Sequence, residues 1–119
     1  MKTSISMRIL GTMLLVLFAK ISLATTYFAS GTILKIISLD RTTYGSNIDS
    51  VLVSGFSSAG SCAHNDGLVG VVFRDDEGGK RQMAMALAAK VSGVTVNIRV
   101  DDSIKTANGY CFLQVLEFN

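Results

Sequence analysis

The stretch KRQMAMALAAKVSGVTVNIRV, residues 80–100, changes its hydrophobic period at Gly93 and decides the fold. Before the glycine, apolar residues recur at the spacing of an amphipathic helix. After it, apolar and polar residues alternate with the two-residue period of a half-buried strand. Gly93 itself can adopt the left-handed conformation that commonly ends a helix. The sequence therefore predicts a helix over residues 80–92, followed at once by a strand over residues 94–101.

The predicted helix carries one apolar stripe along its length. We expect the stripe to pack against the rest of the domain, while Lys80, Arg81 and Lys90 stay in solvent. The acidic residues 75–77 precede the helix, where negative charge interacts favourably with the helix dipole. The expected contact stripe consists of Met83, Ala84, Leu87 and Val91.

Four further strands are predicted around this unit. The first is apolar on both faces, as expected for a long strand that is buried twice or bent between two sheets. The complete order is three strands, a helix and two strands, which is that of an OB-fold. This fold class is mainly β with one helix, a five-stranded Greek-key barrel; a small open α+β sheet with the helix on one face is the alternative. The four strands are expected at residues 32–39, 51–56, 68–74 and 110–118.

The last predicted strand has two apolar rows where one is expected. One face holds Cys111, Leu113 and Val115, and the opposite face is interrupted only by Gln114. Either the strand bends between two sheets, or the second row meets a partner or a ligand. If exposed in the monomer, this row would serve subunit contact in a closed ring. The second row consists of Tyr110, Phe112, Leu116 and Phe118.

Residues 1–24 have the pattern of a secretory signal peptide. Positive charge without acidic residues precedes an apolar run at residues 9–18, which is well short of the roughly 20 residues that span a bilayer. Residues 22–24, SLA, offer small side chains at the −3 and −1 positions of a peptidase site. We expect cleavage after Ala24, a secreted or periplasmic domain at residues 25–119, and no stable membrane anchor. An uncleaved anchor or a buried helix is the alternative.

The domain expected after cleavage holds both cysteines and is close to neutral. In an exported protein an even pair of cysteines is first interpreted as a disulfide, so Cys62 and Cys111 are predicted to be bonded. Two free buried thiols are the alternative. Residues 25–119 contain eight basic and nine acidic residues, a net charge near −1. Such a domain has no general attraction for polyphosphate, which argues against nonspecific nucleic-acid binding.

The sequence contains no clear catalytic or cofactor motif. His64 is the only histidine, and with Cys62 oxidised too few ligands remain for a zinc site. Residues 60–62, GSC, do not form a Gly-x-Ser-x-Gly elbow. Residues 78–80, GGK, lack the spacing and the following Ser or Thr of a phosphate loop. We therefore expect no enzyme activity, no metal and no cofactor.

Residues 87–96, LAAKVSGVTV, with the polar loop after them and residues 109–113, GYCFL, resemble small exported bacterial proteins. The fold of those proteins is similar to that of the B subunits of subtilase-cytotoxin-type and pertussis-like toxins. The signal peptide, the strand start at residues 31–33 and the positions of the two cysteines match as well. The resemblance implies an OB-fold, a pentameric homo-oligomer, a toxin catalytic subunit as partner and binding of cell-surface glycans. No motif allows a sugar-contacting residue to be carried over from those proteins.

The function expected is recognition by an exported, non-catalytic protein. A toxin B-subunit-like glycan binder is the first interpretation, and a periplasmic binding or inhibitory module for a protein or a small ligand is the alternative. An aromatic face beside amide groups suits a hexose, so residues of this kind next to turns are the candidate ligand contacts. They are Tyr44, Asn47, Asn108 and Tyr110.

Overall fold

The computed structural model describes residues 24–39 and 49–118. Residues 1–23 of the predicted signal peptide, which comprises residues 1–24, and the candidate contacts Tyr44 and Asn47 lie outside these residues. The described chain is mainly β-strand with one long helix, which confirms the predicted class. Its elements are β1 (Thr26–Ile37), β2 (Ser50–Val53), β3 (His64–Asn65), β4 (Leu68–Val69), β5 (Val71–Val72), α3 (Glu77–Ser92), β6 (Thr95–Lys105) and β7 (Cys111–Glu117).

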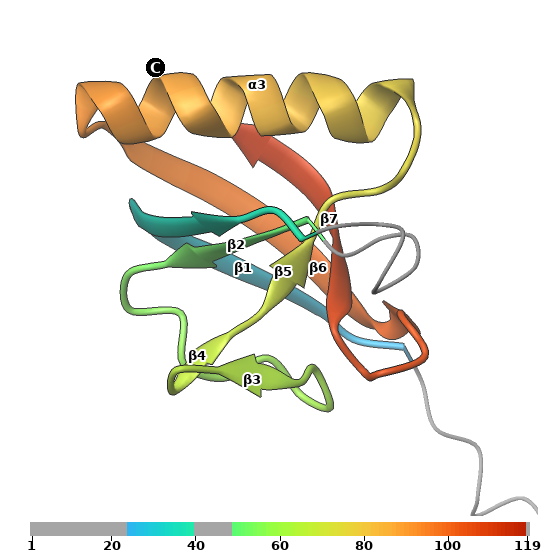
Figure 1. Ribbon diagram of the computed structural model, residues 1–119. Coiled ribbons are helices and arrows are strands. Elements are labelled where there is room, and N and C mark those ends of the chain that lie inside the picture. Colours follow the sequence, from blue (N-terminus) through green and yellow to red (C-terminus); the bar gives the residue numbers. More distant parts are fainter. Residues whose placement is uncertain (1–23, 40–48, 119) are drawn as a thin grey trace, which may run out of the picture.

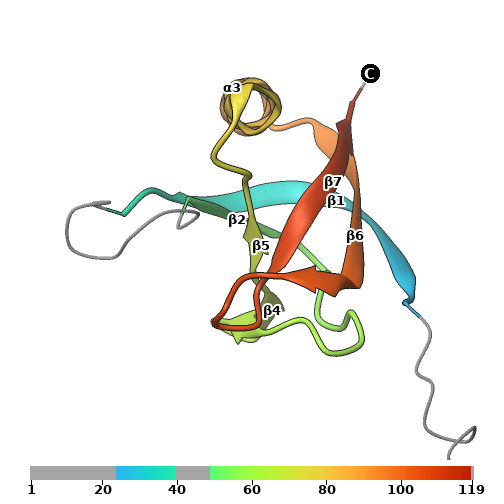
Figure 2. The same cartoon turned by 90° about the vertical axis from the view of Figure 1, so that its right-hand side faces the viewer.

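Five strands form one ladder whose pairing returns to the strand where it began. The hydrogen-bonded order is β1-β2-β5-β7-β6, and β6 pairs again with β1. The β5–β7 pair is parallel, and the other pairs of the ladder are antiparallel. The helix α3 crosses one end of the ladder, and the separate β3–β4 hairpin lies near the other end (Figure 1). Figure 2, in which α3 is seen end-on, shows the same arrangement from the side.

The hydrophobic core fills the inside of this ladder beneath α3. It is built from β-branched and other apolar side chains of all five strands, and among the described residues no polar or charged residue is buried. The largest fully buried side chains are those of Val53, Val69, Val71, Val96, Val100, Cys111 and Leu113.

The strand β1 serves two different partners along its length. Its first part, residues 26–32, pairs with β6, and its second part, residues 33–37, pairs with β2. Leu34 is an extra residue between the pairs that Ile33 and Lys35 make with β2, which is a β-bulge. The prediction of a long first strand with two partners is confirmed, although the strand begins at Thr26 and not at residue 32.

A second bulge explains the two apolar rows of β7. Leu113 lies opposite Val100 and Val115 lies opposite Arg99, so Gln114 is an extra residue. Because alternate residues point to opposite faces, one extra residue reverses the faces beyond it. Leu116, only 8% exposed, therefore belongs to the same core as Leu113.

The second row therefore does not form one exposed face: Leu116 is buried, and Tyr110, Phe112 and Phe118 are partly buried. Phe118 is only partly buried but packs against the core, and the ring of Phe112 lies 5.3 Å from the Arg74 guanidinium carbon. The large apolar side chains that are exposed belong to other segments: Phe28, Leu34, Leu39, Met85, Leu87 and Val91.

Several predicted boundaries were wrong because backbone pairing differs from the apolar pattern. The third strand, expected over residues 68–74, is split at Gly70 into β4 and β5. The loop expected before it contains β3, which pairs with β4. The polar loop expected from residue 101 begins only after Lys105, because Asp101 pairs with Thr26 of β1 and Lys105 pairs with Cys111 of β7, with an irregular stretch between them.

The helix α3 does not pack through the predicted stripe. Leu87 is 48% exposed and Val91 is 89% exposed, so these two side chains point to solvent. The buried face consists of the small residues Gly79, Ala86 and Ala89, with Met83 half-buried beside them. Small residues let the helix backbone approach the strands closely, which a leucine at these positions would prevent.

Two polar side chains on the packed side of α3 bind the bulges. Lys90 Nζ donates to the backbone carbonyl of Leu34 at 3.1 Å, and Gln82 Nε2 donates to that of Gln114 at 3.3 Å. Each acceptor belongs to a bulge residue, whose backbone groups lie outside the regular ladder. Lys90 is exposed, as predicted, and its ammonium group also makes this contact with β1.

Both ends of α3 are capped, and Gly93 is the C-terminal cap that the sequence predicts. Asp76 is the N-cap residue, and its carboxylate accepts a hydrogen bond from the Gly79 backbone N–H at 2.7 Å. Gly93 closes the other end in the left-handed conformation, with φ of 68°. The helix therefore begins at Glu77, three residues before the predicted start.

The two glycines in the first turn of α3 form a matched test of its docking. A Cβ atom on Gly79 would overlap the carbonyl of Arg74, whereas on Gly78 it would meet only side-chain atoms at 3.4 Å or more. We expect Gly79→Ala to lower the free energy of unfolding by roughly 1–3 kcal/mol through overpacking. Gly78→Ala should stay within about 1 kcal/mol of the wild type. Urea denaturation measures both, and equal small losses would contradict the close approach of helix and loop.

Candidate functional site

The two candidate contacts within the described residues, Asn108 and Tyr110, lie in and beside the tight turn between β6 and β7. The Thr106 backbone N–H donates to the Tyr110 carbonyl at 2.8 Å, and the Gly109 N–H donates to the Thr106 carbonyl at 3.0 Å. The Thr106 hydroxyl accepts a further bond from the Tyr110 N–H at 3.2 Å. Gly109 has φ of 88°, a conformation that favours glycine, and Asn108 is exposed just before it. The turn thus holds the Asn108 amide in solvent.

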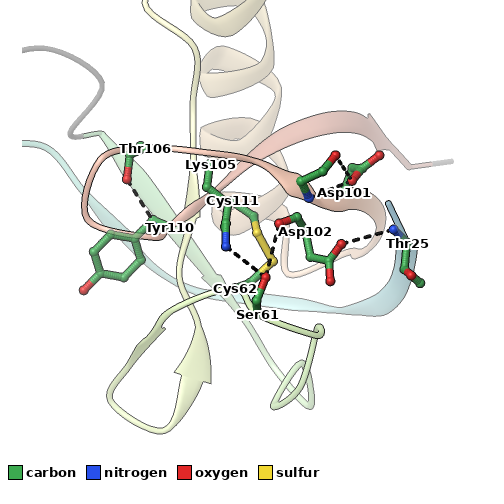
Figure 3. Close-up of a disulfide and its surroundings, with 10 residues drawn as sticks. Thr25, Ser61, Cys62, Asp101, Asp102, Lys105, Thr106, Tyr110 and Cys111 are labelled. Carbon is green, nitrogen blue, oxygen red and sulfur yellow. Dashed lines mark hydrogen bonds between the residues drawn. A yellow bond between two sulfur atoms is a disulfide. The ribbon is translucent and has the colours of Figure 1, made fainter. Parts of the chain in front are cut away.

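The ring of Tyr110 is half-buried against the backbone of Gly70. A Cβ atom on Gly70 would lie 2.6 Å from Cδ1 of this ring, so only a glycine leaves room for it. In Figure 3 the ring points away from the disulfide and its hydroxyl is directed outward. Tyr110 therefore offers a supported aromatic side chain in the same turn region as the exposed residue Asn108.

The loop before β3 connects this turn to the β3–β4 hairpin. The Ala63 backbone N–H donates to the Gly109 carbonyl at 2.9 Å, and the Ala63 carbonyl accepts from the Gly70 N–H at 3.0 Å. His64, the next residue, is exposed and its Nε2 lies 2.8 Å from the Ser57 carbonyl. Backbone hydrogen bonds of Ala63 thus join the β3–β4 hairpin region to the β6–β7 turn.

The predicted disulfide is present and ties this corner together. Cys62 and Cys111 are bonded, with their Cα atoms 5.4 Å apart, and both residues are buried. Cys62 directly precedes Ala63, and Cys111 is the first residue of β7. The disulfide therefore holds the loop before β3, which contacts the β6–β7 turn, against β7, which follows that turn.

A small polar network lies beside the disulfide (Figure 3). Lys105 Nζ donates to the Ser61 hydroxyl at 2.9 Å, and this hydroxyl donates to the Asp102 carbonyl at 3.2 Å. A serine–lysine pair acts as a nucleophile when burial activates the amine, but Ser61 and Lys105 are both exposed. We interpret the network as a brace between the loop and β6.

The carboxylate of Asp101, the residue before Asp102 in β6, accepts hydrogen bonds from Ser103. Its Oδ1 accepts the Ser103 hydroxyl at 2.6 Å and the Ser103 backbone N–H at 2.8 Å. These two bonds, with the hydroxyl as the larger influence, lower the pKa of Asp101 from its ordinary value. Asp101 and Asp102 are thus neighbouring carboxylates with separate partners.

Within residues 24–39 and 49–118, no group of three or more His, Cys, Asp or Glu side chains is placed to hold a metal ion. In the same part of the chain, no helix has the length and apolar character required to cross a bilayer.

Comparison with known proteins finds no match among family models, curated proteins or solved structures. The interpretation of this surface therefore rests on the geometry of the chain itself. Sequence reasoning located Asn108 and Tyr110 but missed Gly70, Ala63 and the hairpin around them. Ala63 acts through backbone groups, and Gly70 through its lack of a side chain, so the residue types give no signal.

Removing the disulfide should destabilise the domain strongly. The two cysteines are 49 residues apart, for which the chain-entropy model predicts a loss of about 4 kcal/mol. We expect the double variant Cys62→Ala, Cys111→Ala to show this loss in urea denaturation, compared with the oxidised wild type. A thiol assay on the denatured, unreduced wild type should find no reactive group, and two reactive thiols would contradict the bond.

Proposed function

We propose that this chain is an exported, non-catalytic binding protein with an OB-fold, which recognises a glycan at the turn between β6 and β7. Binding of oligosaccharides by the loops after the first and fourth strands is a known use of the OB-fold. In this assignment the β6–β7 turn follows the fourth strand. Asn108 and Tyr110 lie in or beside that turn.

The strand order supports the OB-fold assignment. Taken in sequence, β1, β2, β5, β6 and β7 are strands one to five, and α3 lies between the third and the fourth. The first strand pairs with both the second and the fourth, and the third pairs in parallel with the fifth. An open α+β sheet would lack the return pairing of β6 with β1.

The observation that carries the glycan proposal is the supported ring of Tyr110 beside an exposed amide. One side of the ring packs on Gly70, so little conformational freedom remains to be lost when a ligand stacks on it. The apolar face of a hexose can lie on an aromatic ring, while the Asn108 amide can donate and accept hydrogen bonds with its hydroxyl groups. An apolar surface with a few oriented polar groups is typical of small-ligand sites.

Export is the second part of the proposal. The disulfide between Cys62 and Cys111 fits an oxidising compartment, either extracellular or periplasmic. The signal-peptide pattern and the resemblance to toxin B subunits favour the same location.

Two functions remain within this class. A toxin-like B subunit would form a ring with a catalytic partner, whereas a periplasmic binding or inhibitory module would act without that assembly. A reading frame for a toxin catalytic subunit beside this one would favour the first, and so would a pentameric mass of the exported protein.

The glycan site is tested by variants of the exported protein on a glycan array, followed by titration of the best glycan. We expect Tyr110→Ala to weaken binding by about three- to tenfold, the range expected for loss of an aromatic contact. Tyr110→Phe should retain stacking, and Asn108→Ala should lose hydrogen bonds without loss of packing. Arg81→Ala, on the exposed side of α3 at the far end of the ladder, is the control and should bind like the wild type.

The same array, combined with the mass of the exported wild type from size-exclusion chromatography with light scattering, separates the two functions. A wild-type monomer with no array signal would remove the glycan proposal and leave the periplasmic module. Glycan binding that survives both Tyr110→Ala and Asn108→Ala would place the site elsewhere. Urea denaturation of each variant shows whether loss of binding is loss of folding.

A further inference from the structure

We propose that Asp102 is the receptor for a new amino terminus at Thr25, created when the Ala24–Thr25 bond is hydrolysed. The processed chain would then begin with an ion pair that fastens its first residue to β6. This inference rests on the export part of the proposed function and on the expected cleavage after Ala24, and it adds the group that receives the new amino terminus.

The backbone of Thr25 is held on both sides by Asp102 (Figure 3). The Thr25 nitrogen lies 3.1 Å from Oδ1 of the Asp102 side chain. The Thr25 carbonyl accepts the Asp102 backbone N–H, also at 3.1 Å. The next residue, Thr26, begins β1 and pairs with Asp101 in the regular ladder. Thr25 is thus the residue at which the chain joins the folded domain.

The Asp102 carboxylate lies against Gly60, whose lack of a side chain makes room for it. A Cβ atom on Gly60 would overlap Oδ2 of Asp102, so the side chain lies where only a glycine leaves space. The other nearby charged groups have separate partners: Lys105 binds the Ser61 hydroxyl, and the Asp101 carboxylate binds Ser103. Asp102 Oδ1 is therefore directed to the start of the chain.

Processing changes the chemistry of this contact while keeping its position. Hydrolysis of the Ala24–Thr25 bond consumes one water molecule, leaves a carboxylate on Ala24 and leaves an α-ammonium group on Thr25. A neutral amide donor thus becomes a cationic donor to the same oxygen, and charge-assisted hydrogen bonds are roughly twice as strong as neutral ones. Ala24 and Thr25 are both exposed, so a peptidase can reach the bond between them.

The geometry also makes the position of cleavage matter. Cleavage one residue earlier would leave an amide on Thr25 and place the free amine beyond it. Cleavage one residue later would remove the donor altogether. Only cleavage after Ala24 converts the nitrogen that lies 3.1 Å from Asp102 Oδ1 into the charged amine, and the same bond is the one that the SLA pattern predicts.

A double-mutant cycle on the exported protein tests the inference. One chain has the natural junction, and a second carries one Gly inserted between Ala24 and Thr25, which moves the amine away while keeping an amide on Thr25. Each is combined with Asp102→Asn, and with Asp101→Asn as the control of equal charge change. Mass spectrometry verifies each amino terminus, and urea denaturation gives the unfolding equilibrium constant.

We expect the natural junction to yield a product beginning at Thr25. Asp102→Asn should raise its unfolding constant by about threefold more than it does in the Gly-extended chain, the size expected for one surface ion pair. Asp101→Asn should have the same effect in both chains. Equal effects of Asp102→Asn in the two chains, or an exported product with another first residue, would overturn the inference. A product that stays in the cytoplasm and begins at Met1 would instead refute export, and with it the premise.

Discussion

Two one-residue bulges, at Leu34 in β1 and Gln114 in β7, are the constraint on which the arrangement of the chain depends. A regular strand keeps one set of side chains on one face along its whole length. The bulge at Gln114 reverses that assignment, so that Leu113 before it and Leu116 after it enter the same core. The carbonyl groups of both bulge residues are bound by α3, through Lys90 and Gln82. The helix is therefore oriented by polar contacts at two points as well as by apolar packing between them.

This constraint explains which parts of the fold could be predicted from the sequence. The change from helix to strand at Gly93, the glycine cap itself and the pairing of the two cysteines could be predicted, because each follows from residue types and their spacing along the chain. The packed face of α3 could not be found in this way. Leu87 and Val91 are the larger apolar residues, but Gly79, Ala86 and Ala89 allow the close approach that lets Lys90 reach Leu34. The register of β7 was equally hidden, since two apolar rows are compatible with a bend, an interface or a bulge.

The candidate site could also be predicted only in part: residues with distinctive side chains were found, and contacts made by the backbone were not. Tyr110 and Asn108 were identified because aromatic and amide groups near a turn have recognisable chemistry. Their support was missed: Gly70 acts by having no side chain, and the loop at Ala63 is joined to the turn by backbone hydrogen bonds. The disulfide, the Ser61–Lys105 brace and the start of β1 at Thr26 all meet near this corner (Figure 3). A rigid corner of this kind is suited to holding a ligand contact in one conformation.

The register of β7 against β6 in solution is the most direct test of this structure. Nuclear Overhauser effects across the two strands should connect Val100 with Leu113 and Arg99 with Val115, with Gln114 outside the ladder. Detection of Gln114 directly opposite Arg99 or Val100, in an unbroken ladder, would contradict the bulge, and with it the single core and the docking of α3 that depend on it.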